Sequence, residues 1–411
     1  MGLFQQPAEV VRTPMLGLSF PLFPLAFLTA IFYLNFVSRI ILGPFLPVIE
    51  HELGLGHGGA GSLFLFVQIG YATGLLGSGI VSWRFTHRHT IVTSAAVVGI
   101  AMVGLSLAAS LGAMRFWLVL IGAGAGLYLP SGVATITHLV HDGHWGKALA
   151  FHELAPNLAF ITAPLLAEAF LATISWRGVL AIVGSVAVLL GGCFALSGPG
   201  GGQRGEPPRL QTMAGLLRDP SVWAMMLVFA AGVGSSLGLY SMLPLFLVSD
   251  LGMTLRAANS ITGLSRVACL AVAFVSGWLT DRVGHRRALT VALTTTASLN
   301  LCLGLFPGPA LTPVFVFLQG AAAVMFFPPA FAAVSRIVPV QMRNLGVALT
   351  TAVGVFLGGG AVPALVGYVA EVASFSTAFT VVGALAIFSP LLLRISSRSE
   401  PATNHDGDHK Q

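Results

Sequence analysis

Two arginines stand inside long apolar stretches of the sequence, where a charge needs a reason. Arg39 lies deep in the run over residues 19–44, and Arg266 lies about midway along the run over 257–279. A cation at the centre of a membrane-spanning helix costs at least ~2.5–3.5 kcal/mol, so such groups usually serve a functional site. Because guanidinium binds carboxylate and phosphate through paired hydrogen bonds, both arginines predict contact with an anion.

The alternative interpretation is structural, with each arginine paired to a buried acid or to backbone carbonyls. Neither arginine has a carboxylate neighbour in its own run, and Glu153 is the one acid elsewhere that is deep enough to pair. One carboxylate cannot neutralise two cations. Asn35, one helical turn before Arg39, and Gln68, which an internal duplication places opposite Arg266, are further candidates for substrate contact.

Polar residues also form a stripe along the run over 115–140. Tyr128, Ser131, Thr135 and His138 follow one another at spacings of three, four and three, which puts them on one face of a helix. Such a face either lines a cavity or donates hydrogen bonds to a neighbouring helix. Tyr240, in the run over 222–248, is another candidate for the cavity wall.

A second set of polar residues opens the run over 147–172. Glu153 lies roughly 9 Å along a helix from Lys147, and Asn157 follows one turn deeper. With His152 and His138, these residues are candidates for carrying a coupling proton or for closing a gate. The alternative is that Glu153 simply benefits from its place near a helix N-terminus.

No motif for catalysis or for a cofactor is present in the sequence. It contains no Walker loop, no nucleophile elbow and no His-Glu-x-x-His pattern. His138, His141 and His144 have a spacing that could place two rings on one face, but they lack cysteine partners, so we assign no metal site. We expect neither an enzyme nor a resident cofactor.

The composition indicates which elements position these residues. The chain has 411 residues, of which 55% are hydrophobic and 8% charged, whereas a soluble domain is about 25% charged. Few charges exclude a soluble globular protein, and high hydrophobicity excludes disorder. The continuous apolar runs predict an all-α protein that crosses the lipid bilayer many times. The formal net charge of +6 is scattered over loops, so we expect no nucleic-acid partner.

Twelve apolar runs are long enough to span a bilayer. Residues 198–221, rich in glycine and proline, cannot span and predict a cytoplasmic linker between an N-terminal half (1–197) and a C-terminal half (222–395). Residues 396–411 predict a disordered cytoplasmic tail. The expected spans are 19–44, 60–82, 90–112, 115–140, 147–172, 177–197, 222–248, 257–279, 287–306, 311–335, 344–370 and 375–395.

The distribution of basic residues predicts the orientation. With the N-terminus inside, 15 of the 20 Lys and Arg residues fall inside, two lie within spans, and three (Arg115, Arg177 and Arg256) fall outside. Cytoplasmic loops carry the positive excess in membrane proteins. We therefore expect both termini in the cytoplasm, in a multi-pass protein of the bacterial inner membrane.

The two halves repeat one pattern at an offset of 198 residues. Gly79-Ile-Val-Ser-Trp-Arg-Phe-Thr-His-Arg88 aligns with Gly277-Trp-Leu-Thr-Asp-Arg-Val-Gly-His-Arg286, and both segments follow the second span of their half. Pro130 aligns with Pro328 in the same way. Parallel repeats of this kind build transporters whose substrate site lies between the halves.

The segment from Gly277 to Arg287 resembles the loop signature of the major facilitator superfamily, with a Gly followed after four residues by Asp281 and Arg282. The resemblance implies two six-helix halves, close packing at Gly277, and a conformational latch at Asp281 and Arg282. In the first half Trp83 and Thr86 replace the Asp and Gly, so we expect an asymmetric latch. Gly122-Ala-Gly-Ala-Gly126 is similar to the glycine-rich packing stretch of the family's fourth helix.

The leading hypothesis is a monomeric secondary transporter that moves a small anion by alternating access. The substrate class would be a carboxylate, a phosphate ester or an anionic metal chelate, coupled to protons or exchanged for another anion. The alternatives are a proton-coupled drug or metabolite efflux pump and a non-transporting receptor or assembly subunit on the same fold. An efflux pump predicts an acid near the centre, where this sequence has bases.

Overall fold

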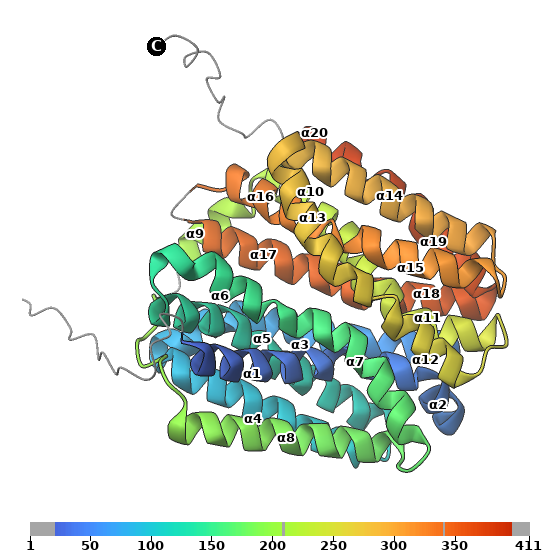
Figure 1. Ribbon diagram of the computed structural model, residues 1–411, viewed down its shortest axis with the longest axis horizontal. Helices are drawn as coiled ribbons and strands as arrows, with labels where there is room; N and C mark the ends of the chain where they lie inside the picture. The colour runs from blue at the N-terminus through green and yellow to red at the C-terminus, as the bar shows by residue number, and fades with distance from the viewer. Residues whose placement is uncertain (1–20, 208–209, 340–341, 397–411) are drawn as a thin grey trace, which may run out of the picture.

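Long helices lie side by side in the computed structural model, which describes residues 21–207, 210–339 and 342–396 (Figure 1). In these ranges eleven helical stretches are long and apolar enough to cross a membrane, and a twelfth consists of two segments bent by 43°. The prediction of an all-α protein with twelve spans is confirmed. Of the predicted tail, all but residue 396 lies outside the described residues.

The helices up to residue 197 form one group, drawn blue to green in Figure 1. Its first span consists of α1 and α2, and its fifth of a short 3-10 turn, α6 and α7. The bounds are α1 Leu22–Ile40, α2 Leu42–Leu53, α3 His57–Arg84, α4 His87–Ser106, α5 Leu111–Leu139, η1 Asp142–His144, α6 Trp145–His152, α7 Leu154–Leu171 and α8 Trp176–Ser197.

The helices after residue 219 form the second group, drawn yellow to red. Its spans 7 and 11 each contain a π-helical segment, η2 and η4. After the linker helix α9 Leu210–Leu216, the bounds are α10 Pro220–Val233, η2 Gly234–Gly238, α11 Leu239–Ser249, α12 Leu255–Leu264, α13 Val267–Val283, α14 His285–Leu305, α15 Leu311–Val324, α16 Phe327–Ile337, α17 Arg343–Val355, η4 Phe356–Ala361, α18 Val362–Val372, α19 Phe375–Ile387, η5 Ser389–Leu392 and α20 Leu393–Ser396.

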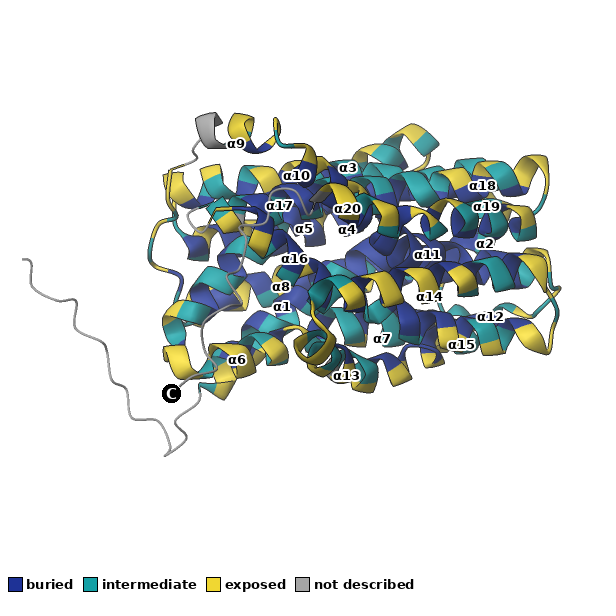
Figure 2. Ribbon diagram, turned by 90° about the horizontal axis from the view of Figure 1, so that it is seen from above, coloured by how far each residue is buried: buried dark blue, intermediate teal, exposed yellow. Residues whose placement is uncertain are grey.

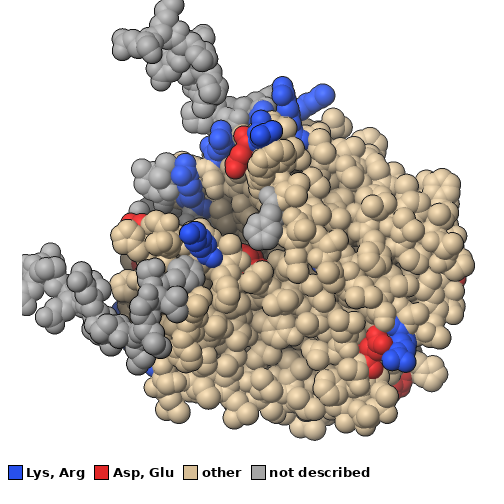
Figure 3. All heavy atoms as spheres, in the orientation of Figure 1, with Lys and Arg blue, Asp and Glu red and all other residues tan. Residues whose placement is uncertain are grey.

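The connection between the groups runs along one end of the bundle, here called the linker end. It is tied to the first group, because Arg88 N donates to Gly201 O at 2.7 Å and Gly205 N donates to Ser82 O at 3.0 Å. On the face drawn in Figure 3, most Lys and Arg side chains gather at this end. The opposite end, where α2, α12 and α18 finish or begin, is here called the far end.

The first span is longer than the sequence predicted. It continues past Pro44 to Leu53, because Ile41 keeps a helical backbone and Pro44 falls in the first turn of α2, where a missing N–H costs little. The far end of this span therefore reaches the second group.

Close packing inside the first group follows from glycine. A Cβ on Gly122 would collide with Val67 O, and one on Gly126 would collide with Tyr71 O, so α5 and α3 touch through their backbones. The predicted packing role of this glycine-rich stretch is confirmed. Figure 2 shows buried residues between the helices and exposed residues along the outer faces, where many are large and apolar, as a lipid-facing surface requires.

Candidate functional site

Arg39 is buried on α1, with its side chain directed at α3. Its guanidinium carbon lies 3.6 Å from the ring centre of Tyr71, and its Nη2 donates to Gln68 Oε1 at 3.3 Å. The Nε group is buried without a hydrogen-bond partner. Arg39 is thus held by an aromatic face and an amide, and it keeps one unused donor.

Arg266 is buried in the second group, at the junction of α12 and α13. Its guanidinium carbon lies 4.8 Å from the ring centre of Tyr240 and 5.3 Å from that of Phe160. Its Nε and Nη2 are both buried without a hydrogen-bond partner. These two donors form one edge of the guanidinium group, the edge that can grip an oxyanion in bidentate fashion.

An aromatic pair joins the surroundings of the two arginines. Phe36 lies 5.2 Å from the Arg39 guanidinium carbon, and its ring centre is 5.0 Å from that of Phe160, which borders Arg266. Tyr240 crosses between the groups, because its hydroxyl donates to Phe160 O at 2.7 Å. The two buried cations therefore belong to one cluster between the helical groups, joined by the half-buried rings of Phe36 and Phe160.

No carboxylate neutralises this cluster among the residues that the structure describes. Ion pairs in those ranges join, for example, His57 to Glu50, Arg177 to Glu52 and Arg256 to Glu168, whereas Arg39 and Arg266 take part in none there. Glu153, the acid that the sequence left as a possible partner for one arginine, forms an ion pair with neither. Two buried cations without an acid are poised to attract an anion.

The polar stripe on α5 faces the interior of the first group. Tyr128 donates to Leu28 O at 2.7 Å and lies 3.1 Å from His152 Nε2, while Ser131 lies 3.1 Å from His87 Nδ1. Thr135 donates to the backbone oxygen of Ser131. Of the two interpretations, hydrogen bonding to neighbouring helices fits these contacts. His138 is exposed at the last turn of α5 and stands apart from them.

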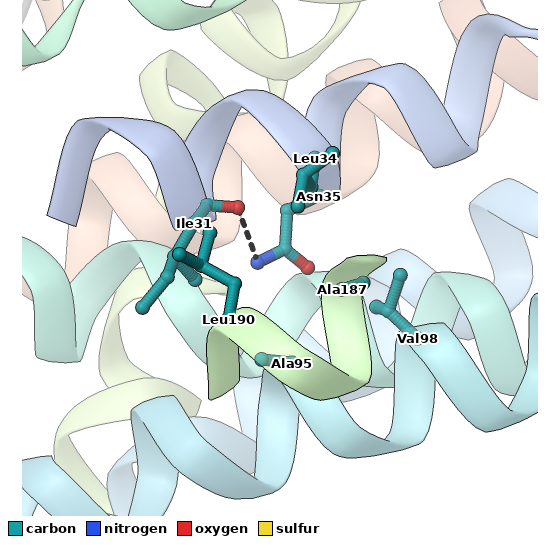
Figure 4. Close-up of a pocket in the computed structure, with 7 residues that line it drawn as sticks. All are labelled: Ile31, Leu34, Asn35, Ala95, Val98, Ala187 and Leu190. Carbon is teal, nitrogen blue, oxygen red and sulfur yellow. Dashed lines mark hydrogen bonds between the residues drawn. The ribbon is translucent and has the colours of Figure 1, made fainter. Parts of the chain in front are cut away.

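Asn35 also turns away from Arg39. Its Nδ2 donates to Ile31 O at 3.2 Å, and its Oδ1 accepts from Ser94 at 3.3 Å. Figure 4 shows the side chain directed into a small pocket between α1, α4 and α8, where apolar residues surround it. The structure does not bring Asn35 together with the arginines, because its amide is engaged within the first group.

The residues proposed for coupling divide into buried and exposed sites. His152 is fully buried, stacked on Phe32 with ring centres 4.4 Å apart, and its Nδ1 has no hydrogen-bond partner. Glu153 is exposed at the break between α6 and α7, and Asn157 donates to its backbone oxygen at 2.8 Å. Glu153 precedes Phe160 by two helical turns, so it lies on the linker side of the aromatic pair.

The loop-signature residues lie at the linker end, where Asp281 and Arg282 do not form the expected latch. Asp281 and Arg282 are exposed, and Arg282 lies over the ring of Trp278 at 4.3 Å. The expected close packing at Gly277 is wrong for this conformation, because a Cβ there would meet no atom within 4 Å. The physical reason is the lack of a neighbouring helix at that point.

The far end is closed by contacts between the groups. Glu168 on α7 accepts from Arg256 Nε at 2.8 Å and from Ser260 Oγ at 2.7 Å, both from α12. Glu371 on α18 accepts from Gly58 N at the start of α3 at 2.9 Å. Two further cross-group hydrogen bonds, from Tyr240 Oη to Phe160 O and from Asn259 Nδ2 to Pro44 O, lie closer to mid-bundle.

Sequence reasoning missed three parts of this arrangement. Phe36 had a local signal, because it stands three residues before Arg39 on the same helical face. Phe160 had none, since only the packing of α7 against α1 brings it to the centre. Glu168 and Glu371 stand near helix ends, where an acid normally meets water, and their partners come from distant segments.

Two groups of membrane-length helices, with Arg39 and Arg266 buried between them, define a multi-pass helical membrane protein. The chain belongs to the Major Facilitator Superfamily, whose family model matches residues 25–271 and 239–410.

Curated relatives of this chain are distant. The chain is 23% identical over 306 residues to a probable L-galactonate transporter of Escherichia coli K12, a match that spans 68% of this chain and 64% of that protein. It is 27% identical over 117 residues to the probable nitrate/nitrite transporter NarK2 of Mycobacterium tuberculosis H37Rv, spanning 28% and 29%. These matches span less than two thirds of the relatives' lengths.

Solved structures share the fold at low sequence identity. A bacterial homologue of the human lysosomal transporter Spinster, in an inward-facing and occupied conformation, superposes with a TM-score of 0.78 at 17% identity, covering 93% of this chain and 98% of that one. A D-xylose-proton symporter gives 0.74 at 15% identity, covering 92% and 98%. Likenesses at these identities define the fold alone.

Proposed function

We propose that this protein carries a small organic or inorganic anion across the membrane by alternating access, with Arg39 and Arg266 as its anion contacts. The observation that carries the proposal is the pair of buried guanidinium groups, one from each helical group, that flank Phe36 and Phe160 without a carboxylate partner. An entering anion would offset the cost of two unneutralised buried cations.

The aromatic faces favour this role. A ring under the plane of a guanidinium group holds it by cation–π attraction and leaves its edge donors free. Tyr71 does so for Arg39 and Tyr240 for Arg266. The named substrates of the two curated relatives, galactonate and nitrate or nitrite, are anions, which supports the same class here.

The contacts at the far end support one state of a transport cycle. We propose that the linker end faces the cytoplasm, with both termini on that side, and that the described conformation opens inward. Arg282 and Asp281 would then engage when the linker end closes. We place the protein in a bacterial inner membrane and treat it as a monomer, because each half contributes one arginine to a single site.

Coupling is proposed to use protons or a counter-anion. Glu153 is exposed on the linker side of the aromatic pair, and His152 next to it keeps a free ring nitrogen inside the first group. A proton on Glu153 would accompany an anion through the linker side. The efflux alternative predicts an acid beside the central site, and no described acid contacts either arginine.

Uptake into proteoliposomes tests the proposal with a panel of nitrate, galactonate, inorganic phosphate and a sugar phosphate. The variants are Arg39→Gln and Arg266→Gln, with Arg84→Gln as the control because Arg84 is exposed at the linker end. Losing a hydrogen bond to a charged group costs ~1.5–3 kcal/mol, so each central variant should lose roughly 10- to 150-fold in affinity. Normal uptake by both central variants would refute the proposal.

A further inference from the structure

The two arginines are not equivalent in the structure. Arg266 has both edge donors, Nε and Nη2, without a partner, whereas the Nη2 of Arg39 already donates to Gln68 Oε1. The Nε–Nη2 edge of Arg266 could therefore bind an anion in bidentate fashion without first breaking a hydrogen bond. At Arg39 the same anion would have to compete with the amide of Gln68.

Gln68 is held in place by the opposite helical group. A Cβ on Gly360 would lie 3.1 Å from the Gln68 Cβ, and one on Gly359 would lie 3.4 Å from its Cδ and Nε2. Both glycines belong to the π-helical segment η4 in span 11, and Gln68 itself is only 1% exposed. The η4 backbone of the second group therefore packs against Gln68, the side chain that engages Arg39 in the first group.

The π-helical segments give this contact its geometry. A π turn widens the helix and is found frequently at functional sites. η4 packs on η2 through glycine, since a Cβ on Gly238 would lie 2.5 Å from Gly358 O. Without side chains, the run from Gly358 to Gly360 can approach both its own group and Gln68. The position of the Gln68 side chain therefore depends on the relative orientation of the two helical groups.

We propose that Gln68 is a positioning residue for Arg39. In one conformation its amide occupies the donor edge of Arg39, and in the other it leaves that edge available to the anion. In the described conformation η4 seats Gln68 against Arg39, and the anion is held mainly by Arg266, which favours its release. When the groups rock and η4 shifts, Gln68 turns away and Arg39 offers Nε and Nη2 together. This inference rests on the proposed anion transport.

The repeat supports this division of labour. Gln68 and Arg266 occupy equivalent positions, 198 residues apart, in spans 2 and 8. The second half thus carries the cation Arg266 at the position where the first half carries Gln68, the amide that engages Arg39. The position equivalent to Arg39 is Leu237, whose side chain would lie 2.8 Å from a Cβ on Gly359. The difference between the two halves, an arginine in one and a leucine in the other, therefore lies at positions that pack close to η4.

The decisive variant is Gln68→Leu, which removes the acceptor and keeps a side chain of similar size. Arg39 then has an unpaired donor in the empty site, which a bound anion satisfies. We expect the purified variant in detergent to bind the transported panel anion about tenfold more tightly, while its maximal transport rate falls because release is slower. Gln68→Glu supplies a permanent carboxylate to Arg39, and it should weaken binding by a similar factor.

A double-mutant cycle with Arg39→Gln separates positioning from mere packing. If Gln68 acts through Arg39, the tighter binding of Gln68→Leu disappears in the Arg39→Gln background. The inference is overturned if Gln68→Leu binds the anion as tightly as the wild type or less tightly. It is also overturned if the tighter binding of Gln68→Leu persists in the Arg39→Gln background. In either case the proposed anion transport can still hold, because it is tested separately by the loss of binding in Arg266→Gln. Failure of the wild type to bind or transport any panel anion defeats the proposed function itself. Retention of the wild-type elution profile on size-exclusion chromatography shows that each variant is folded.

Discussion

Removing Glu168 should move the protein away from its far-end-closed conformation. Glu168 accepts from Arg256 at 2.8 Å and from Ser260 at 2.7 Å, and these are contacts between the two helical groups. Glu168→Ala deletes both. The change leaves the central cluster untouched, so an altered conformational equilibrium can be attributed to the far end.

The magnitude follows from exposure. The Arg256 side chain is 83% exposed and that of Glu168 is 20% exposed, so the ion pair contributes about 0.2–1 kcal/mol. The hydrogen bond from Ser260 to a carboxylate contributes about 1 kcal/mol more at such a partly exposed site. A total of about 1–2 kcal/mol shifts the ratio of the two conformations by roughly 5- to 30-fold. Glu371, which holds Gly58 N, should add a similar step when both acids are removed.

Spin labels or fluorophores report this shift as distances. One pair is attached at His141→Cys and Arg287→Cys, both exposed at the linker end and outside the proposed coupling and latch residues, in a background without Cys193 and Cys302. We expect the linker-end distance to shorten in Glu168→Ala. Arg177→Ala is the matched control, because it breaks an ion pair with Glu52 at the same end but within one group. Identical distance distributions for Glu168→Ala and the wild type would refute the gating argument.

Three further results are expected. Gly122→Val should lower the thermal unfolding temperature in detergent by several degrees, because its Cβ would meet Val67 O and overpacking costs ~1–3 kcal/mol, whereas Gly112→Val, with open space around it, should not. Tyr128→Phe should destabilise the protein by about 1–2 kcal/mol, because it loses the hydrogen bonds to Leu28 O and His152, and its KM should be unchanged. A raised KM at unchanged stability would instead show that Tyr128 lines the substrate cavity. Glu153→Gln should abolish stimulation of uptake by a proton gradient while anion exchange persists, as measured by counterflow; full stimulation would exclude Glu153 as the proton carrier.

The sequence by itself determined the membrane class, the number of spans and the presence of two unneutralised cations. These properties are local, because hydropathy and span length reflect the transfer of each segment from water into lipid. The repeat at 198 residues also lies in the sequence and predicts two halves. Arg39 and Arg266 could be identified because a buried charge is costly wherever its helix turns.

Only the tertiary structure decided which way each polar side chain faces. α3 and α5 are apolar on most sides, so their sequences do not mark the face that meets a neighbour. Tyr128 and Asn35 consequently turned inward to partners in their own group, while Phe160 reached the site through the packing of α7. The contacts of Gln68 with Gly359 and Gly360 join segments almost 300 residues apart, and they exist only because the two helical groups pack face to face.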